Sequence, residues 1–310
     1  MFTILAITAP IFILIGLGFA SSRFGLFSKI QIAGLGSFVI NIALPALIVK
    51  ALGQKPIGEV FDIGFLSAYG LGSLAVFALG LWFSFKVRKD NFASSTISAL
   101  GMSTSNSAFI GYPIVSMVLG PPAAVALALC ILLENLIMLP LALILSEGKG
   151  TQRGESTGVL LLNLAKRMAK NPIIIAIIVG LALSLTGLSI GPIVAKVIDM
   201  LATASAPVAL FVIGGSLYGL KPGGVLVDMA QVSVGKLVLH PLAVFIAFFL
   251  VPGITPEMKA AGVLIASAPM MSIYPIIGQR VGLESRCAAA LVCATVMSFI
   301  SITIWVALIS

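Results

Sequence analysis

Long apolar runs separated by short polar loops extend over the whole chain. A helix needs about 20 apolar residues to cross a bilayer, and cutting the sequence at charged clusters and at Gly and Pro leaves ten runs of about that length. The second, fourth, seventh and ninth runs carry Pro or Gly in their middles, where we expect breaks or kinks. We therefore predict ten membrane-spanning helices, over residues 2–20, 31–52, 62–85, 93–119, 123–146, 172–189, 193–218, 230–251, 258–281 and 286–309.

The composition fits a protein whose surface faces lipid. Hydrophobic residues make up 60% of the 310 residues and charged residues 9%, whereas a soluble domain has about 25% charged residues. Soluble enzymes, nucleic-acid binders and disordered chains are thereby excluded. The three cysteines have neither metal-ligand nor disulfide spacing, and the single histidine argues against zinc chemistry. We expect no catalytic residues, no metal site and no cofactor.

The placement of lysine and arginine predicts the orientation in the membrane. When successive loops are assigned to alternate sides, one side receives thirteen of the 18 cations and the other receives four. Loops rich in Lys and Arg stay in the cytoplasm. The side with thirteen, which includes the long polar segment 147–171, is therefore predicted to be cytoplasmic, and both termini are predicted to lie outside.

An internal repeat relates the two halves of the chain. An offset of 162 residues superimposes three prolines, the triplet Tyr112-Pro113-Ile114 and several glycines without a gap; coincidence in a biased composition is the alternative. Residues 1–147 and 172–310 then form two five-helix repeats joined by a cytoplasmic loop, 148–171. Since five is odd, the second repeat enters the membrane from the opposite side, which is a common plan of secondary transporters. The matched prolines are Pro10 with Pro172, Pro45 with Pro207, and Pro113 with Pro275.

Broken helices at matched positions of two inverted repeats indicate a binding site near the bilayer midplane. Proline removes a backbone donor, and lipid cannot satisfy the groups that a break leaves unpaired. The fourth run combines such a break with a cluster of hydroxyls and one amide, and the ninth run carries the matching break. The alternative is that these prolines are ordinary kinks and that the serines bond to their own backbone. The predicted substrate-binding residues are Ser105, Asn106, Ser107, Tyr112, Pro113, Ser272, Tyr274 and Pro275.

Asn41 precedes Pro45 in the second run. Its amide could donate a hydrogen bond toward a substrate cavity, and we include it among the substrate-binding candidates. An ordinary helix–helix hydrogen bond is an equal alternative.

Three ionisable residues fall inside predicted spans: Glu134 in the fifth, and Lys236 and His240, one helical turn apart, in the eighth. An ionisable group inside a membrane is costly and by default suggests a function. We treat all three as candidates for H⁺ or Na⁺ coupling, with Glu134 paired to Lys236 or carrying a proton. Alternatively, Lys236 reaches the interface with its long side chain and His240 is a satisfied core residue.

Four segments resemble, in order, those of one known family. They are Asn41-Ile42-Ala43-Leu44-Pro45-Ala46-Leu47, Ser105-Asn106-Ser107-Ala108-Phe109-Ile110-Gly111-Tyr112-Pro113, the stretch 206–217 with its Ala-Pro and Gly-Ser pairs, and Gln279-Arg280-Val281-Gly282. Nearly the whole chain is similar to the auxin efflux carrier family, which includes bacterial carriers and the PIN-type carriers of plants. The resemblance implies a ten-helix inverted fold related to the bile-acid sodium symporters. It also implies a scaffold of spans 1, 2, 6 and 7, and a mobile transport domain of spans 3–5 and 8–10, with Asn106 at the crossing of spans 4 and 9.

Together these observations predict a secondary active transporter of small organic anions, such as mono- or dicarboxylates or auxin-like acids, that works by elevator-type alternating access. A sodium-coupled symporter of the bile-acid type is the alternative. A channel is disfavoured because no run shows a continuous polar stripe, and an enzyme because catalytic groups are lacking. We expect the protein to lie in the bacterial cytoplasmic membrane. Its expected partners are the organic anion and the lipid bilayer, and it is not expected to bind nucleic acid. Whether it forms a homodimer is left open.

Overall fold

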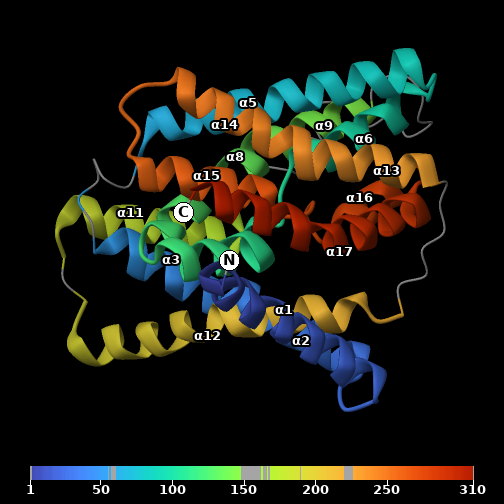
Figure 1. The fold of residues 1–310 in the computed structure, drawn as a ribbon. Coiled ribbons are helices and arrows are strands. Elements are labelled where there is room, and N and C mark those ends of the chain that lie inside the picture. Colours follow the sequence, from blue (N-terminus) through green and yellow to red (C-terminus); the bar gives the residue numbers. More distant parts are fainter. Residues whose placement is uncertain are drawn as a thin grey trace. The chain divides into compact units, whose positions relative to one another are not determined.

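The computed structural model describes residues 2–54, 56, 61–147, 162, 166, 168–188, 190–219 and 226–309. The described residues form helices and connecting turns, and no strand occurs among them (Figure 1). Six of these helices are long and apolar enough to cross a membrane: Lys29–Gly53, Ile63–Val87, Pro122–Ser146, Pro192–Leu217, Leu226–Leu250 and Glu284–Ile309. The prediction of an all-helical protein with membrane-spanning helices is confirmed. The predicted loop 148–171 lies outside the described residues, except for 162, 166 and 168–171.

The chain divides into two compact units, and each unit contains parts of both sequence halves. The first unit comprises residues 1–63, 108–129 and 169–219, and the second comprises 64–107, 130–168 and 220–310. Helix α8 (Pro122–Leu133) starts within the ranges of the first unit and ends within those of the second. The structural units are therefore different sets of residues from the sequence repeats.

The first unit is built from pairs of closely packed helices. Helix α1 (Phe2–Arg23) packs along α12 (Pro192–Leu217), and α11 (Pro172–Thr186) packs along α3 (Leu44–Gly53) (Figure 1). A Cβ on Gly18 would lie 2.0 Å from the carbonyl oxygen of Phe211, so only glycine permits the approach of α1 to α12. The remaining helices of this unit are α2 (Lys29–Phe38), the π-helical turn η1 (Val39–Ala43) and α7 (Tyr112–Leu119).

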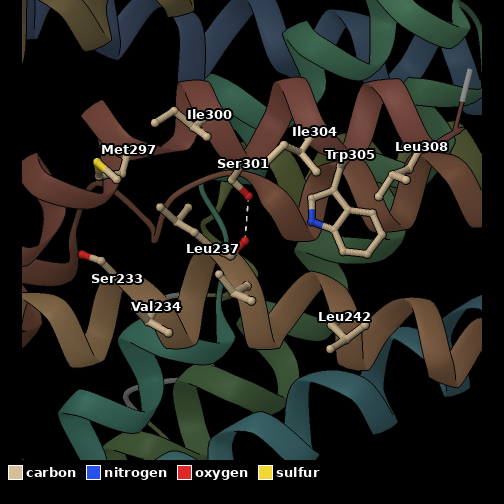
Figure 2. A pocket seen from close by; sticks show the side chains of 11 residues that line it. Ser233, Val234, Leu237, Leu242, Met297, Ile300, Ser301, Ile304, Trp305 and Leu308 are labelled. Carbon is tan, nitrogen blue, oxygen red and sulfur yellow. Dashed lines mark hydrogen bonds between the residues drawn. The ribbon is translucent and has the colours of Figure 1, made fainter.

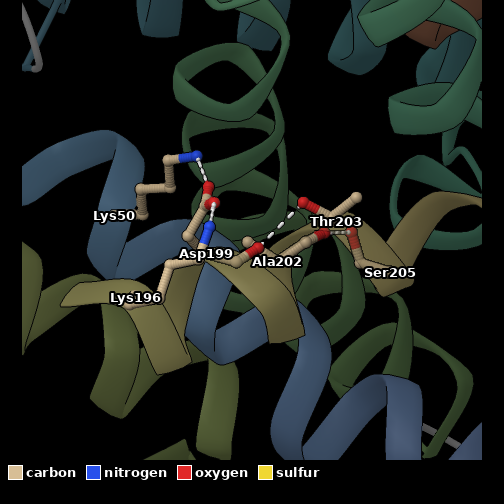
Figure 3. A network of polar contacts seen from close by, with 6 residues as sticks. All are labelled: Lys50, Lys196, Asp199, Ala202, Thr203 and Ser205. Carbon is tan, nitrogen blue, oxygen red and sulfur yellow. Dashed lines mark hydrogen bonds and ion pairs between the residues drawn. The ribbon is translucent and has the colours of Figure 1, made fainter. Parts of the chain in front are cut away.

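An ion pair between Lys50 on α3 and Asp199 on α12 joins two helices of the first unit (Figure 3). Lys196 lies one turn before Asp199, at 3.9 Å from its carboxylate. The side chains of Lys50 and Asp199 are 37% and 41% exposed, so solvent screens the attraction and the pair adds little stability.

The second unit contains most of the other helices and π-turns. They are α5 (Ile63–Trp82), η2 (Phe83–Val87), α6 (Phe92–Ser103), η4 (Glu134–Met138), α9 (Leu139–Glu147), α13 (Leu226–Val234), η5 (Gly235–Leu239), α14 (His240–Leu250), α15 (Pro256–Ser267), α16 (Tyr274–Gln279) and α17 (Glu284–Ile309). Helices α13 and α17 run side by side (Figure 1). Asp228 on α13 accepts from Arg88 after η2 and from Arg286 on α17, which ties these elements together.

The second and seventh runs, where the sequence indicates a break or a kink, contain no break. Residues 29–53 form one continuous helical segment, and Pro207 lies inside α12 without interrupting it. Before Pro45 the helix widens into the π-turn η1, in which the Leu44 amide donates to the carbonyl of Val39. This wider turn leaves room for the proline ring, which would otherwise clash with the carbonyl four residues earlier.

A π-turn precedes a proline at three further places in the chain. The π-turns η3 (Ser107–Gly111), η4 and η5 end two residues before Pro113, Pro140 and Pro241 respectively. Such turns are frequent at functional sites, and here η4 begins with Glu134 and η5 contains Lys236.

Candidate functional site

The fourth and ninth runs are broken, as the sequence predicts. Helix α6 ends at Ser103, and Thr104 has an extended backbone with φ −123° and ψ 149°. Helix α15 ends at Ser267, Ala268 is also extended, and α16 begins only at Tyr274. Pro275 occupies the first turn of α16, where its missing amide hydrogen costs no helical bond.

The two breaks are in direct contact within the second unit. The backbone amide of Asn106 donates to the carbonyl of Pro269 at 2.7 Å, and its side-chain Nδ2 donates to Ser272 Oγ, also at 2.7 Å. Asn106 is only 4% exposed. One asparagine therefore joins the non-helical segments of two helices that are far apart in the sequence.

Glu134 lies at the first of these breaks. Its Oε1 accepts from the backbone amide of Ser105 at 2.9 Å, and both carboxylate oxygens lie within 3.0 Å of Ser107 Oγ. The Glu134 side chain is buried. Both neighbours donate, so the contacts suit an ionised carboxylate, which can only accept.

Lys236 is fully buried and lies on the other side of Ser105. Its Nζ lies 2.8 Å from Ser105 Oγ, 2.6 Å from the carbonyl oxygen of Ala266 and 2.6 Å from Nδ1 of His240. The alternative that Lys236 extends to the membrane interface is wrong, since its exposed fraction is 0%. Glu134 and Lys236 are linked through Ser105, one by its backbone amide and the other by its hydroxyl.

The contacts of Lys236 define the state of His240. An ammonium has three donors and no acceptor, and Lys236 has three neighbours that can accept. With Lys236 as an ammonium, His240 Nδ1 accepts, and the ring hydrogen is assigned to Nε2, which lies 2.9 Å from Ser73 Oγ. His240 is thus a neutral, satisfied imidazole in this arrangement.

Several sequence-predicted residues meet in this cluster and others do not. Ser105, Asn106, Ser107 and Ser272 contact one another or the buried charges, and the ring of Tyr274 packs where a Cβ on Gly101 would lie, 2.5 Å away. The remaining candidates belong to the first unit or make local contacts: Tyr112 and Pro113 open α7, and Asn41 donates to the carbonyl and hydroxyl of Ser37 on its own helix.

Three members of the cluster were missed by the sequence analysis. Tyr69 Oη lies 3.3 Å from Ser105 Oγ, Ser73 accepts from His240, and the carbonyl of Ala266 accepts from Lys236. Tyr69 and Ser73 are one helical turn apart on α5, and this polar pair on one face of an apolar helix was the available signal. A backbone carbonyl leaves no such trace in the sequence.

A separate cavity of about 320 Å³ lies along α13, η5, α14 and α17 (Figure 2). Its lining is apolar apart from Ser233 and Ser301. Ser301 Oγ donates to the carbonyl of Leu237 at 2.6 Å (Figure 2), a carbonyl without an i+4 amide donor because Pro241 follows four residues later. Because almost all of its lining is apolar, this cavity offers few donors to a small anion.

Comparison with known proteins gives a consistent family. The sequence profile of the family described as "Membrane transport protein" matches residues 3–306. The "Putative malonate transporter" of Rhizobium meliloti is 28% identical over 305 residues, covering 98% of this chain and 95% of that protein. The "Uncharacterized transporter YfdV" of Escherichia coli is 24% identical over 94% of this chain and 92% of its own length. The "Lysosomal cholesterol signaling protein" of Mus musculus is 27% identical over 73% of this chain, which is 27% of that longer protein.

Proposed function

Because the chain belongs to the membrane transport protein family that includes the auxin efflux carriers, we propose that it is a secondary active carrier of small organic anions. The observation that carries this proposal is the contact between two broken helices through Asn106. Secondary transporters bind their substrates at such paired breaks. Substrate would enter and leave by alternating access of an elevator type.

The ten-helix inverted repeat is part of the proposal, and helix positions support it. Two of the long helices begin at residues 29 and 122, and two others begin at 192 and 284, which are offsets of 163 and 162. The apolar helices α1 (Phe2–Arg23) and α11 (Pro172–Thr186) and the two broken helices bring the number of proposed spans to ten. Glycines at matched positions share a positive φ, namely Gly25 (75°) with Gly187 (65°), and Gly120 (68°) with Gly282 (74°).

We further propose that spans 1, 2, 6 and 7 form a scaffold and that spans 3–5 and 8–10 form the moving domain. The division into compact units supports this grouping for most of the chain. The first unit holds α1, α2, α3, α11 and α12, and the second holds α5, α6, α13, α14, α15 and α17. Residues 108–129, which belong to spans 4 and 5, fall in the first unit, so the division does not support their place in the moving domain.

The substrate class follows from the chemistry around Asn106. An amide donor and the hydroxyls of Ser272 and neighbouring serines suit a carboxylate, and the nearby Lys236 uses its donors within the protein. A carboxylate would compete with Ser272 for Asn106 Nδ2 instead of pairing with a buried cation. The name of the Rhizobium relative points to malonate, so short dicarboxylates are the first substrates to test, followed by monocarboxylates and indole acids.

The membrane setting completes the proposal. The bias of Lys and Arg supports a cytoplasmic membrane with both termini outside, and the cluster around Glu134 and Lys236 is where ion coupling would act. A sodium-coupled symporter of the bile-acid type remains the second candidate function, since an unwound helix pair is also where a coupling Na⁺ binds.

The direct test is a thermal-shift screen of the purified protein against short mono- and dicarboxylates and indole acids. A binding acid should raise the melting temperature, and Asn106→Ala should remove that rise. Asn41→Ala is the matched control, because the Asn41 amide bonds to its own helix, and it should keep the response. A shift that survives Asn106→Ala would contradict the proposed site, and substrate counterflow without unitary currents would separate a carrier from a channel.

A further inference from the structure

Lys236 places an amine where water does not reach. Its side chain is 0% exposed, and its three contacts match the three donors of an ammonium. No carboxylate within 4 Å of Nζ is found among the described residues. The charge is therefore held chiefly by oxygen and nitrogen acceptors and by the more distant Glu134.

Two of these acceptors are typical ligands of a bound cation. The carbonyl of Ala266 belongs to the last turn of α15, and because the helix ends at Ser267 no amide four residues later in that helix donates to it. Ser105 Oγ belongs to the non-helical segment after α6. Unwound segments and helix C-terminal ends, which carry partial negative charge, bind coupling cations in transporters.

The ammonium also has a counter-charge within the same cluster. Glu134 accepts from the backbone amide of Ser105, the residue whose hydroxyl contacts Lys236. The carboxylate is itself held by Ser107. One negative and one positive group are thus fixed on opposite sides of Ser105.

We propose that the ammonium of Lys236 is a resident cation, which takes the position that an exchangeable Na⁺ would otherwise occupy at the crossing of the two broken helices. The inference rests on the proposed carrier function and deepens it, because it decides between the two candidate modes. A tethered ammonium returns with the protein in every cycle, so it neutralises the site without drawing on a sodium gradient. The wild-type carrier is then independent of Na⁺.

The inference makes a second statement about the vacated site. When the side chain is shortened, as in Lys236→Ala, the acceptors Ser105 Oγ and Ala266 O and the nearby Glu134 carboxylate remain, and a small hard cation fits their oxygen chemistry. Lys236→Ala is therefore expected to gain a site for Na⁺. Lys236→Met is the matched control, since its side chain fills the volume of the lysine stem without a charge.

The experiment measures melting temperature for purified wild type and both variants in NaCl and in choline chloride at equal ionic strength. We expect no sodium-specific shift for wild type or Lys236→Met. For Lys236→Ala we expect a saturable rise of about 3 °C at a Na⁺ concentration ten times its dissociation constant. Should Lys236→Ala not fold, Lys236→Ser leaves the same space and adds a hydroxyl. Substrate counterflow by the wild type tests the inference without a variant, and its rate in choline chloride should be within about twofold of that in NaCl.

A saturable sodium shift in the wild type, a requirement for Na⁺ in wild-type counterflow, or a folded Lys236→Ala without a sodium response would each overturn the inference. These outcomes are separate from a failure of the proposed function. If no carboxylate shifts the wild-type melting temperature but Lys236→Ala responds to Na⁺, the substrate class is wrong and the resident cation stands. If carboxylates bind and Lys236→Ala shows no response to Na⁺, the proposed substrate class stands and the resident cation is wrong.

Discussion

The link between Glu134 and Lys236 through Ser105 predicts a coupling energy that can be measured. Removing either charge leaves the other buried without its counter-charge, which typically costs 3–5 kcal/mol when a buried pair is broken. The isosteric Glu134→Gln and the neutral Lys236→Met are the suitable changes. Both should destabilise the protein strongly when made singly.

The size of the coupling follows from the contacts. Lys236 Nζ lies 2.8 Å from Ser105 Oγ, and Glu134 Oε1 lies 2.9 Å from the Ser105 amide nitrogen. The short span of Ser105 itself therefore keeps the two charges within about 9 Å of each other. At an effective dielectric constant of about 20, opposite charges at that separation attract by about 2 kcal/mol.

The assay is a double-mutant cycle on equilibrium unfolding in mixed detergent. The double variant Glu134→Gln with Lys236→Met should cost about 2 kcal/mol less than the sum of the two single variants. As a control, Glu134→Gln combined with Lys50→Met should be additive, because Lys50 pairs with Asp199 in the other unit and shares no partner with Glu134. Additivity within about 0.5 kcal/mol for the Glu134–Lys236 pair would refute the reasoning.

Three further predictions address packing, the surface and coupling. Gly101→Ala should destabilise by about 1–3 kcal/mol, since its Cβ would lie 2.5 Å from the ring of Tyr274. Adding Tyr274→Leu to Gly101→Ala should restore part of the lost free energy of unfolding, and a double variant without any such recovery would contradict this contact. Lys50→Ala should cost at most about 1 kcal/mol because the ion pair is partly exposed, and a loss above about 2 kcal/mol in the same unfolding assay would be inconsistent with that. If a pH gradient drives uptake in vesicles, Glu134→Gln should abolish that dependence, and unchanged dependence would exclude Glu134 as the proton carrier.

The breaks at the proposed site could be predicted from the sequence because they are local features. One break falls in the run of Ser, Thr and Asn before η3, and the other comes directly before Pro275 in the first turn of α16. The one-turn spacing of Lys236 and His240 places them on one helix face. The same local reasoning failed at Pro45 and Pro207, where the helix runs through the proline. The π-turn η1 accommodates Pro45, α12 accommodates Pro207 without one, and the sequence does not reveal either local geometry.

The contacts that make the site were beyond such reasoning because they depend on tertiary packing. Ser272, which accepts from the Asn106 side chain, is 166 residues away, and one of the three partners of Lys236 is a backbone carbonyl. A cluster of Ser and Asn residues reveals donors and acceptors, but not which of them the protein uses internally. The structure shows that Lys236, which the sequence offered as a coupling group, has all three donors occupied.

Because its donors are occupied, Lys236 is a poorer contact for a carboxylate substrate than Asn106 is. A carboxylate substrate cannot pair with Lys236 unless it displaces Ser105, Ala266 or His240, each at 2.6–2.8 Å, and displacement would leave a buried acceptor unsatisfied at a cost of about 1–3 kcal/mol. Asn106 exchanges one hydroxyl partner, Ser272, for a carboxylate at much lower cost, because the freed hydroxyl can itself donate to the substrate. In the proposed carrier, Glu134 and Lys236 therefore hold the two broken helices, and the neutral amide of Asn106 is the better contact for a substrate that must also leave.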